Sequence, residues 1–332
     1  MADYKGIKGF KVAQLASDPT ANEGQTWYNT TTSLLKYDGV GAGAWASGNN
    51  LNTKRTQLAG GSTGTTTASI VSGGYTSTAP TYMTSNTESW NGTSWTETGN
   101  SVIVARYEVG SAGTSTAAVS FGGSPGSPPY SDVTELYNGS AWTASTAMPS
   151  PRFGVMAPVG TSSISAMAVS GIYPPTTRLN TVAELSGTTW TISPANVNTA
   201  RHSGGGAGSV TSALICGGNT PPKTDKAESW NGSTWTEIAV LNTPRHYNSC
   251  AGTSNTSAMT FGGETPSVTN KTEIWNGSAW TEVGNMVTAT ASQSGNGTTA
   301  AALEVGSPNA TGGLTTQVWD GVPLTVKTVT TS

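Results

Sequence analysis

The chain of 332 residues contains little charge. Lys, Arg, Asp and Glu make up 10% of it, and the formal net charge is −3. About a quarter of the residues are charged in an ordinary globular domain. No cluster of Lys or Arg offers the positive surface that phosphate backbones attract, so we expect no nucleic-acid partner. No apolar run is long enough to cross a bilayer and no signal peptide is recognisable, which predicts cytoplasmic synthesis without membrane insertion.

Residues for metal and redox chemistry are equally scarce. The chain has two histidines, His202 and His246, and two cysteines, Cys216 and Cys250. A zinc or copper site needs three or four converging ligands, so we expect neither a metal nor another cofactor. The cysteines are expected to be buried free thiols, with a disulfide between them as the alternative.

What the chain does contain is a repeated W-N-G-x-x-W pattern. It spans Trp90–Trp95, Trp230–Trp235 and Trp275–Trp280, with looser copies that end at Trp142 and Trp190. The second Trp recurs at positions 45, 95, 142, 190, 235 and 280, about every 45 to 50 residues. A fixed period of this size indicates a repeat architecture.

Each period holds four short runs, illustrated by the fourth. Residues 203–207 are small, residues 213–216 are apolar and precede Gly217-Gly218, and residues 226–230 and 234–238 alternate. Alternation with a period of two, interrupted by Gly and Asn, predicts strands, and Asn-Gly predicts a type I′ hairpin. No segment keeps a helical period. We therefore predict four antiparallel strands per repeat, a to d from the inside outward, in the blades of an all-β propeller.

We predict six four-stranded blades, with seven as the alternative. Five are complete, at about 58–97, 105–144, 153–192, 202–238 and 246–283. The sixth is expected to combine strands c and d from 34–47 with strands a and b from 292–305. Gln317–Gly321 competes for its third strand, in which case the N-terminal hairpin packs elsewhere. The predicted domains are an attachment arm at 1–33, the propeller at 34–314 and a C-terminal strand at 315–332.

The repeat unit resembles kelch repeats over roughly residues 34 to 320. A kelch unit has a Gly-Gly pair after its second strand, an aromatic in its third and a Trp in its fourth. The pair is present at 73–74, 122–123, 217–218 and 262–263, and only Gly171 stands there in the third repeat. The resemblance implies a kelch-like β-propeller and no particular activity, because propellers have many functions.

Arginine and glutamate also follow the repeat. A sialidase-like site would gather three Arg side chains on a carboxylate, and a glycosidase would pair two carboxylates. Recurrence in every complete repeat instead favours a structural role, in which these residues bond backbone groups or each other between blades, so we expect no catalytic residues. The residues assigned to this structural repeat are Trp90, Trp95, Trp142, Trp190, Trp230, Trp235, Trp275, Trp280, Glu88, Glu135, Glu184, Glu228, Glu273, Arg106, Arg152, Arg201 and Arg245.

Binding is expected on the face that the b–c and d–a loops share. The b–c loops, at 75–85, 124–131, 173–179, 219–225, 264–270 and 307–313, differ in length and content. Variable loops on a rigid scaffold commonly carry function, and Tyr offers rigid contact area with a polar tip to a sugar or a protein. The candidate binding residues are Tyr75, Tyr82, Tyr130, Tyr173, Arg178 and Lys223.

The first 33 residues break the repeat. Residues 24–39 resemble segments common in tailed-phage fibre and other virion proteins, and the whole chain resembles kelch-type virion proteins of marine tailed bacteriophages. The resemblance implies a non-enzymatic component of the virion that the arm at 1–33 attaches to other virion proteins. Its loop face would contact host surface polysaccharide or another virion protein, and several copies would assemble in the particle. An exposed strand at 10–15 is suited to pairing with a sheet edge or with the alternating segment 324–329. A glycan-cleaving propeller and an intracellular kelch adaptor are the alternatives.

Overall fold

All regular elements in the described part of the chain are β-strands. The computed structural model describes residues 13–17, 26–40, 43–60, 64–76, 82–99, 102–126, 130–156, 159–307, 313–321 and 324–328, and no helix occurs in these ranges. Accordingly, none of these ranges offers a helix that could cross a membrane. The chain forms two compact units, Ala44–Gly321 and the combination of Met1–Gly43 with Val322–Ser332.

The larger unit contains six four-stranded antiparallel sheets among its described residues. Sheet 1 consists of β5 (Ala59–Gly60), β6 (Ser69–Ser72), β7 (Thr87–Trp90) and β8 (Trp95–Glu97), and sheet 2 of β9 (Gly110–Thr114), β10 (Ala117–Phe121), β11 (Thr134–Tyr137) and β12 (Trp142–Ser145). Sheet 3 consists of β13 (Gly160–Ser162), β14 (Ser165–Val169), β17 (Val182–Ser186) and β18 (Thr189–Ile192), and sheet 4 of β19 (Gly205–Ser209), β20 (Ser212–Cys216), β21 (Ala227–Trp230) and β22 (Trp235–Ile238). Sheet 5 consists of β23 (Ser249–Ser254), β24 (Ser257–Phe261), β27 (Thr272–Trp275) and β28 (Trp280–Glu282), and sheet 6 of β29 (Ser294–Gly297), β30 (Ala301–Val305), β31 (Thr316–Asp320) and β4 (Ala44–Ser47).

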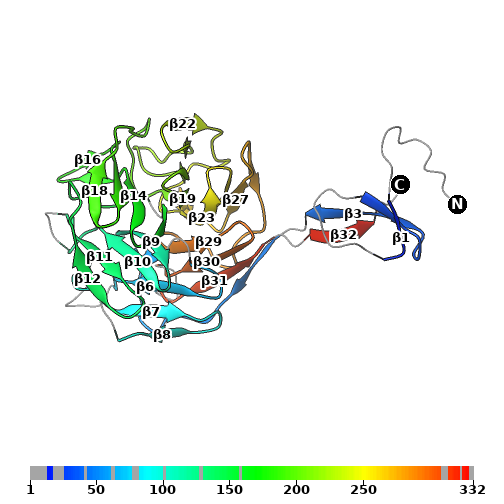
Figure 1. Ribbon diagram of the computed structural model, residues 1–332, viewed down its shortest axis with the longest axis horizontal. Helices are drawn as coiled ribbons and strands as arrows, with labels where there is room; N and C mark the ends of the chain where they lie inside the picture. The colour runs from blue at the N-terminus through cyan, green and yellow to red at the C-terminus, as the bar shows by residue number, and fades with distance from the viewer. Residues whose placement is uncertain are drawn as a thin grey trace. The chain divides into compact units, whose positions relative to one another are not determined.

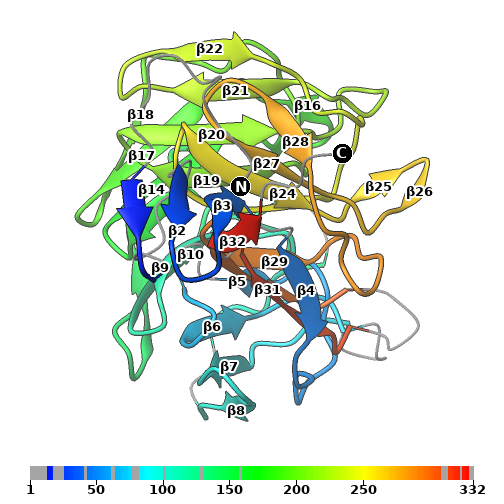
Figure 2. The ribbon, with the colours of Figure 1, turned by 90° about the vertical axis from the view of Figure 1, so that its right-hand side faces the viewer.

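Two small hairpins interrupt the connections between second and third strands. The pair β15 (Ile172–Tyr173) and β16 (Thr177–Arg178) forms a separate two-stranded sheet in the connection of sheet 3. The pair β25 (Glu264–Thr265) and β26 (Ser267–Val268) lies in the connection of sheet 5 and projects from it (Figure 2). Within the larger unit, first strands such as β9, β19 and β23 lie toward the middle and fourth strands such as β12 and β22 toward the rim (Figure 1). This arrangement of sheets is consistent with a β-propeller.

The core of the larger unit lies between neighbouring sheets. Phe121 of sheet 2 packs in one buried cluster with Trp190 of sheet 3, and Ile215 of sheet 4 packs with Val169 of sheet 3. Leu303 of sheet 6 shares a cluster with residues of sheet 1, so sheets built from distant parts of the sequence also face each other. Each sheet thereby buries its apolar faces against its neighbours, which a lone four-stranded sheet does not achieve.

The Asn-Gly pairs stand at the turns between third and fourth strands, as expected. At the first, Asn91 Oδ1 accepts hydrogen bonds from the backbone N–H groups of Thr93 and Ser94, both at 2.9 Å, and Gly92 has a φ of 93°. The same side-chain capping recurs at Asn138, Asn231 and Asn276. The expected type I′ turn is wrong, because only the glycine has a positive φ and four residues separate the paired Trp90 and Trp95.

The repeated Trp residues connect neighbouring sheets. Trp142 Nε1 of sheet 2 donates to Thr87 Oγ1 of sheet 1 at 3.0 Å, and Trp190 of sheet 3 donates to Thr134 of sheet 2 at 2.9 Å. Equivalent bonds run from Trp95 to Thr316 and from Trp45 to Thr272. The pattern explains why a buried indole recurs in the fourth strands: its ring fills the space between sheets and its N–H bonds the neighbouring sheet. Trp235 is an exception, because its Nε1 has no hydrogen-bond partner among the described residues.

The third strand of sheet 6 corrects the sequence prediction. We expected Leu34–Tyr37 to pair with the strand at 301–305, but β31 (Thr316–Asp320) pairs with β30 and with β4. Thr316 and the fully buried Trp319 repeat the Thr and Trp of other third strands, which the Leu-Leu-Lys-Tyr run lacks. The boundaries 34–314 and 315–332 therefore give way to a unit that spans Ala44–Gly321.

The smaller unit is a four-stranded mixed sheet. In it β1 (Ala13–Leu15) runs parallel to β2 (Thr26–Asn29), and β3 (Leu34–Val40) pairs antiparallel with both β2 and β32 (Leu324–Thr328). The indole of Trp27 is fully buried. The expected pairing of the C-terminal segment with 10–15 is wrong for the described residues 13–15, because β1 and β32 occupy opposite edges; residues 10–12 lie outside the described residues. The predicted arm of 1–33 is thus part of a larger module.

Candidate functional site

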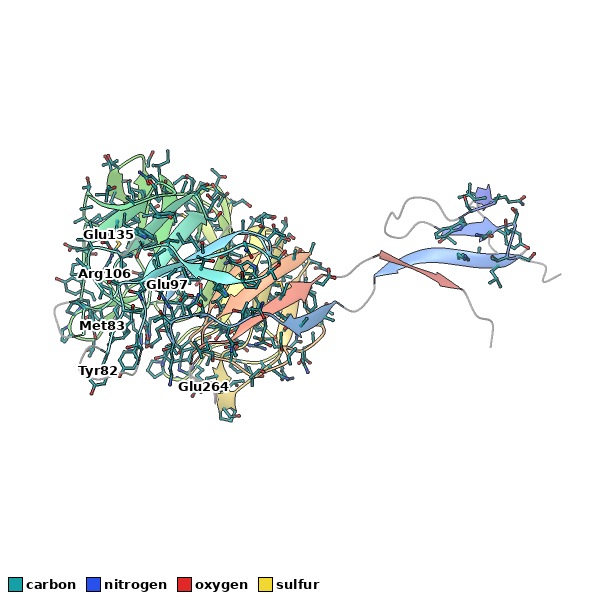
Figure 3. All side chains as sticks on the ribbon, turned by 90° about the horizontal axis from the view of Figure 1, so that it is seen from below. Tyr82, Met83, Glu97, Arg106, Glu135 and Glu264 are labelled. Carbon is teal, nitrogen blue, oxygen red and sulfur yellow. The ribbon has the colours of Figure 1, made fainter. Side chains whose placement is uncertain are left out.

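Four of the repeated arginines form buried ion pairs with glutamates of the same sheet. Arg55 and Glu88 approach to 2.8 Å, Arg201 and Glu228 to 3.0 Å, and Arg245 and Glu273 to 2.5 Å, and these side chains are fully buried. Arg106 and Glu135, which are labelled near each other in Figure 3, form the fourth pair, and their side chains are also buried. The arginines are engaged and inaccessible, so they do not offer the carboxylate-binding triad of a sialidase-like site. Each pair lies within one sheet rather than between two.

The third sheet departs from this pattern. Arg152 donates to the backbone carbonyls of Ala168 and Thr181 at 3.1 and 3.2 Å, and desolvation by burial lowers its pKa to about 10. Buried Ala183 stands where other sheets have their glutamate, and half-buried Glu184 follows one residue later on the opposite side of the strand. The assignment of Glu184 to the structural repeat is therefore wrong, because strand residues alternate between faces and a shift of one position exchanges them.

The sixth sheet replaces the ion pair with uncharged partners. Thr290 stands in place of the arginine and Gln317 in place of the glutamate. Gln317 Nε2 donates to Glu304 Oε2 at 3.0 Å, and burial raises the pKa of Glu304 to about 8, against the opposing effect of its hydrogen bonds. This carboxyl is fully buried and neutral at pH 7.

A closed ring of backbone hydrogen bonds runs through the connections that precede the first strands. In each connection the residue two positions after the repeated Arg, or after Thr290, has a left-handed backbone. Their φ values lie between 49° and 60°. The N–H of each donates to the carbonyl of the preceding one at 2.6 to 3.3 Å, and the circle closes from Gln57 to Ser292. We call these six residues the axial ring: Gln57, Glu108, Gly154, Ser203, Tyr247 and Ser292.

The axial ring surrounds a cavity of about 90 Å³. All six ring residues line it, together with the starts of several first strands, among them Ser111 and Ser249. The ring side chains are of five types, with Ser at both 203 and 292, although the backbone conformation is the same. Glu108 is the one charged side chain among the described residues that line the cavity.

A second cavity, of about 170 Å³, lies among the turns between first and second strands. Its lining consists of Gly, Thr and Ala residues, including Gly64, Thr161 and Gly252, and carries no charge. It lacks groups for specific recognition, so the axial-ring cavity is the stronger candidate site.

The carboxyl of Glu108 is held by two ring neighbours. Gln57 Nε2 donates to Glu108 Oε1 at 2.5 Å, and Ser203 Oγ donates to Glu108 Oε2 at 3.3 Å. Burial raises the pKa of Glu108 to about 7, more than these hydrogen bonds lower it, although the residue keeps some accessible surface toward the cavity. Its charge is therefore poised to change near neutral pH.

The two histidines stand behind the ring. His202 Nδ1 lies 2.9 Å from Ser203 Oγ, and burial, with Arg178 and His246 nearby, lowers its pKa to about 4. The rings of His246 and Tyr247 have centroids 4.3 Å apart, and burial beside Glu108 raises the pKa of Tyr247 to about 12. Since burial lowers the pKa of both histidines, both imidazole rings are neutral at pH 7. No group of three or more potential metal-ligating side chains occurs in the described residues.

Aromatic side chains form a continuous row across sheets 1 to 3. Tyr82 stacks on Tyr75 with centroids 6.0 Å apart, and Tyr75 meets the edge of Tyr107 at 5.7 Å. Tyr107 contacts Phe153 at 5.6 Å, and Phe153 stacks on Tyr130 at 4.9 Å. Tyr82 is 48% exposed and the others are half-buried. We call these five residues the aromatic row.

Three of the six predicted binding residues lie together in the structure, and the other three do not join them. Tyr75, Tyr82 and Tyr130 belong to the aromatic row, whereas exposed Tyr173 has no stacking partner among the described aromatic residues. Arg178 lies near His202, and Lys223 Nζ forms an ion pair with Glu264 Oε1 at 2.9 Å. Tyr82 and Glu264 project on the same side of the larger unit (Figure 3).

The sequence reasoning missed Tyr107, Phe153 and the axial ring. A signal was present: the two residues after each of the five repeated arginines read Thr-Gln, Tyr-Glu, Phe-Gly, His-Ser and His-Tyr. These two residues differ from one repeat to the next, although the arginine before them is constant. A position that departs from the symmetry of the repeat is a candidate for function. The binding residues were instead predicted in the loops between second and third strands.

The two cysteines are buried and free. Cys216 and Cys250 come from neighbouring sheets, and their sulfur atoms lie 3.4 Å apart, a contact rather than a bond. The prediction of two buried free thiols is confirmed.

Comparison with protein-family models and with curated proteins finds no match for this chain.

Proposed function

We propose that the larger unit is a kelch-like β-propeller of six blades. Six four-stranded sheets, the circle of six backbone hydrogen bonds in the axial ring and the Trp contacts between consecutive sheets support this architecture. Seven blades would require another four-stranded sheet in the larger unit. The inclusion of β4 in sheet 6 supplies the closing contact between early and late parts of the chain.

We further propose that this propeller is a non-enzymatic saccharide-binding component of a phage virion. The observation that carries the binding function is the aromatic row, whose half-buried rings end in exposed Tyr82. The apolar faces of sugar rings pack on flat aromatic side chains, and phenolic hydroxyls offer hydrogen bonds at the rim. Host surface polysaccharide is the proposed ligand of this row. The loop face that carries it is the face predicted from the varied loops.

The smaller unit is the proposed attachment module. Its strands come from the segment before β4 and the segment after β31, so it is joined to the propeller by two passes of the chain. Removal of residues 1–33 deletes β1 and β2 and should prevent incorporation of the protein into particles. Normal incorporation of the truncated protein, measured by its presence in purified particles, would contradict this role.

A glycan-cleaving propeller is the second candidate, and Glu108 is the observation in its favour. A carboxyl with a raised pKa suits a general acid. The common glycosidase mechanism needs two carboxylates within about 5 to 10 Å of each other. Among the described residues that line the cavity, Glu108 is the one carboxylate, so a second is missing there. Release of new reducing ends from host polysaccharide would establish this alternative over the binding function.

Replacement of Tyr82 tests the binding function. We expect Tyr82→Ala to weaken binding to host polysaccharide about five- to tenfold, through loss of one stacking platform. The measurement is calorimetric titration with purified capsular and lipopolysaccharide glycans of the host. Tyr173→Ala is the matched control, because Tyr173 is similarly exposed, at 43% against 48%, and lies outside the row. Equal effects of the two replacements would reject the row as the binding surface.

A further inference from the structure

Glu108 lacks the cationic partner that the buried glutamates of the repeat possess. Glu88, Glu135, Glu228 and Glu273 each pair with an arginine. Glu108 is held by an amide and a hydroxyl, and no Lys or Arg occurs among the described residues that line its cavity. An acidic side chain placed in a cavity without a counter-ion is suited to a cation supplied from outside.

Glu304 provides an internal comparison. It also lacks a cationic partner, but it is fully buried between Gln317 and Thr290 and lines neither cavity. Such a carboxyl remains protonated and serves packing. Glu108 differs because it is only half-buried and lines a cavity that a ligand group can enter.

The rest of the cavity suits a small organic cation. A carboxylate has about four lone-pair sites, and two hydrogen bonds from Gln57 and Ser203 leave others for a ligand. The other lining residues include Tyr247, Ser111, Ser249 and Ser292, and the hydroxyl of Ser249 donates to the backbone carbonyl of Gln293 at 2.7 Å. An aromatic face attracts an ammonium group, whereas a hard metal ion prefers six or more oxygen ligands, several of them charged.

The cavity and the aromatic row adjoin each other in sequence and structure. Tyr107, the central member of the row, directly precedes Glu108. Tyr107 also acts electrostatically on Tyr247, which lines the cavity, so a saccharide that lies on the row would be close to the cavity. We propose that the axial-ring cavity binds the primary ammonium group of an amino sugar, with Glu108 as its carboxylate partner. This inference rests on the proposed saccharide-binding function.

Of the titratable groups around the cavity, Glu108 is the one whose pKa lies near neutral pH. Tyr247 beside it has a pKa raised to about 12, and His202 behind Ser203 has a pKa lowered to about 4, both through burial. Lys223 is engaged with Glu264, and the pKa of His246 is lowered by burial. An ammonium group stabilises the ionised carboxylate, so its binding should lower the pKa of Glu108 and release a proton.

The first experiment measures that pKa directly in the full chain. Carboxyl carbon NMR follows the glutamates during pH titration, and Glu108→Gln identifies the Glu108 signal. Glucosamine should lower the pKa of Glu108 by about one unit, whereas glucose at the same concentration should leave it unchanged. Calcium chloride is the third arm. An unmoved pKa with glucosamine, or a shift with calcium alone, would overturn the inference.

The second experiment separates this inference from the binding function. Glucosamine oligomers should bind the wild type about tenfold more tightly than their N-acetylated forms, as one charge-assisted hydrogen bond predicts. Glu108→Gln should remove that preference, while Glu184→Gln, a change at a half-buried glutamate outside the cavity, should keep it. Thermal unfolding verifies that both variants are folded. If the wild type binds both forms of the oligomer equally well, the ammonium site is rejected, while the proposed saccharide-binding function is not affected. A preference that survives Tyr82→Ala with undiminished affinity supports the ammonium site and counts against the aromatic row.

Discussion

Two positions in the same connection behave in opposite ways. The repeated arginine is constant in five of the connections, fully buried and bonded within its own sheet, whereas the axial-ring residue two positions later differs almost everywhere. Both have a fixed backbone geometry, so the difference lies in what the side chain meets. The arginine meets the interior of a sheet, where four of the five pair with a glutamate and Arg152 donates to backbone carbonyls. The ring residue meets a shared cavity, which imposes no common side chain and permits recognition.

The largest expected effect comes from breaking one constant position. Glu273→Ala leaves Arg245 buried without its partner, and we expect the free energy of unfolding to fall by about 3 to 5 kcal/mol. Chemical denaturation measures the loss. Glu184→Ala is the matched control and should change stability by less than about 0.5 kcal/mol, because its side chain forms no such pair. Similar losses in both variants would refute the distinction between the two glutamates.

The next effect concerns sheet 6, where Thr290 and Gln317 stand in place of the ion pair. The pKa of Glu304 is about 8 in the folded protein and near 4.5 when unfolded, so the folded state retains a proton between these values. The free energy of unfolding should therefore fall as pH rises from 4.5 to 8, by on the order of 4 kcal/mol from this group. Glu304→Gln should flatten that part of the stability profile. A profile that keeps its slope in the variant would show that another group is responsible.

The smallest effect is expected at the variable position. Ser292 has a φ of 56°, and Gly154 occupies the equivalent place at 60°. Ser292→Gly removes a strained conformation and adds chain entropy to the unfolded state, so stability should change by less than about 1 kcal/mol. Thermal unfolding is the measurement. A loss comparable to that of Glu273→Ala would mean that ring side chains, and not only ring backbones, hold the sheets together.

Much of the fold was predictable because short-range signals repeat. Alternation around Trp90 and Trp95, with Asn91-Gly92 between them, indicated a hairpin, and the period located the other copies. The origin of the third strand in sheet 6 was not predictable with the same certainty. Both 34–37 and 316–320 alternate, and the choice depended on burial of Trp319 between sheets, which is a long-range property.

The candidate site was predictable only in part. Tyr75, Tyr82 and Tyr130 were identified from their variable loops, but their union through Tyr107 and Phe153 depends on contacts between sheets. The environment of Glu108 depends on Gln57 and Ser203, which come from connections 51 and 95 residues away. Sequence spacing alone does not indicate that six such connections converge, nor that one carboxyl among them lacks a cation.

The pairing of β31 with β4 has a mechanical consequence. Asp320 lies opposite Ala44, so both passes of the chain toward the smaller unit leave from the same end of one antiparallel strand pair. A pulling force applied through the smaller unit is divided between these two neighbouring strands. Detachment then requires β31 to shear away from the five residues of β30 that it faces, rather than one chain end to peel off bond by bond. In the proposed attachment role, this double connection would resist drag on the particle.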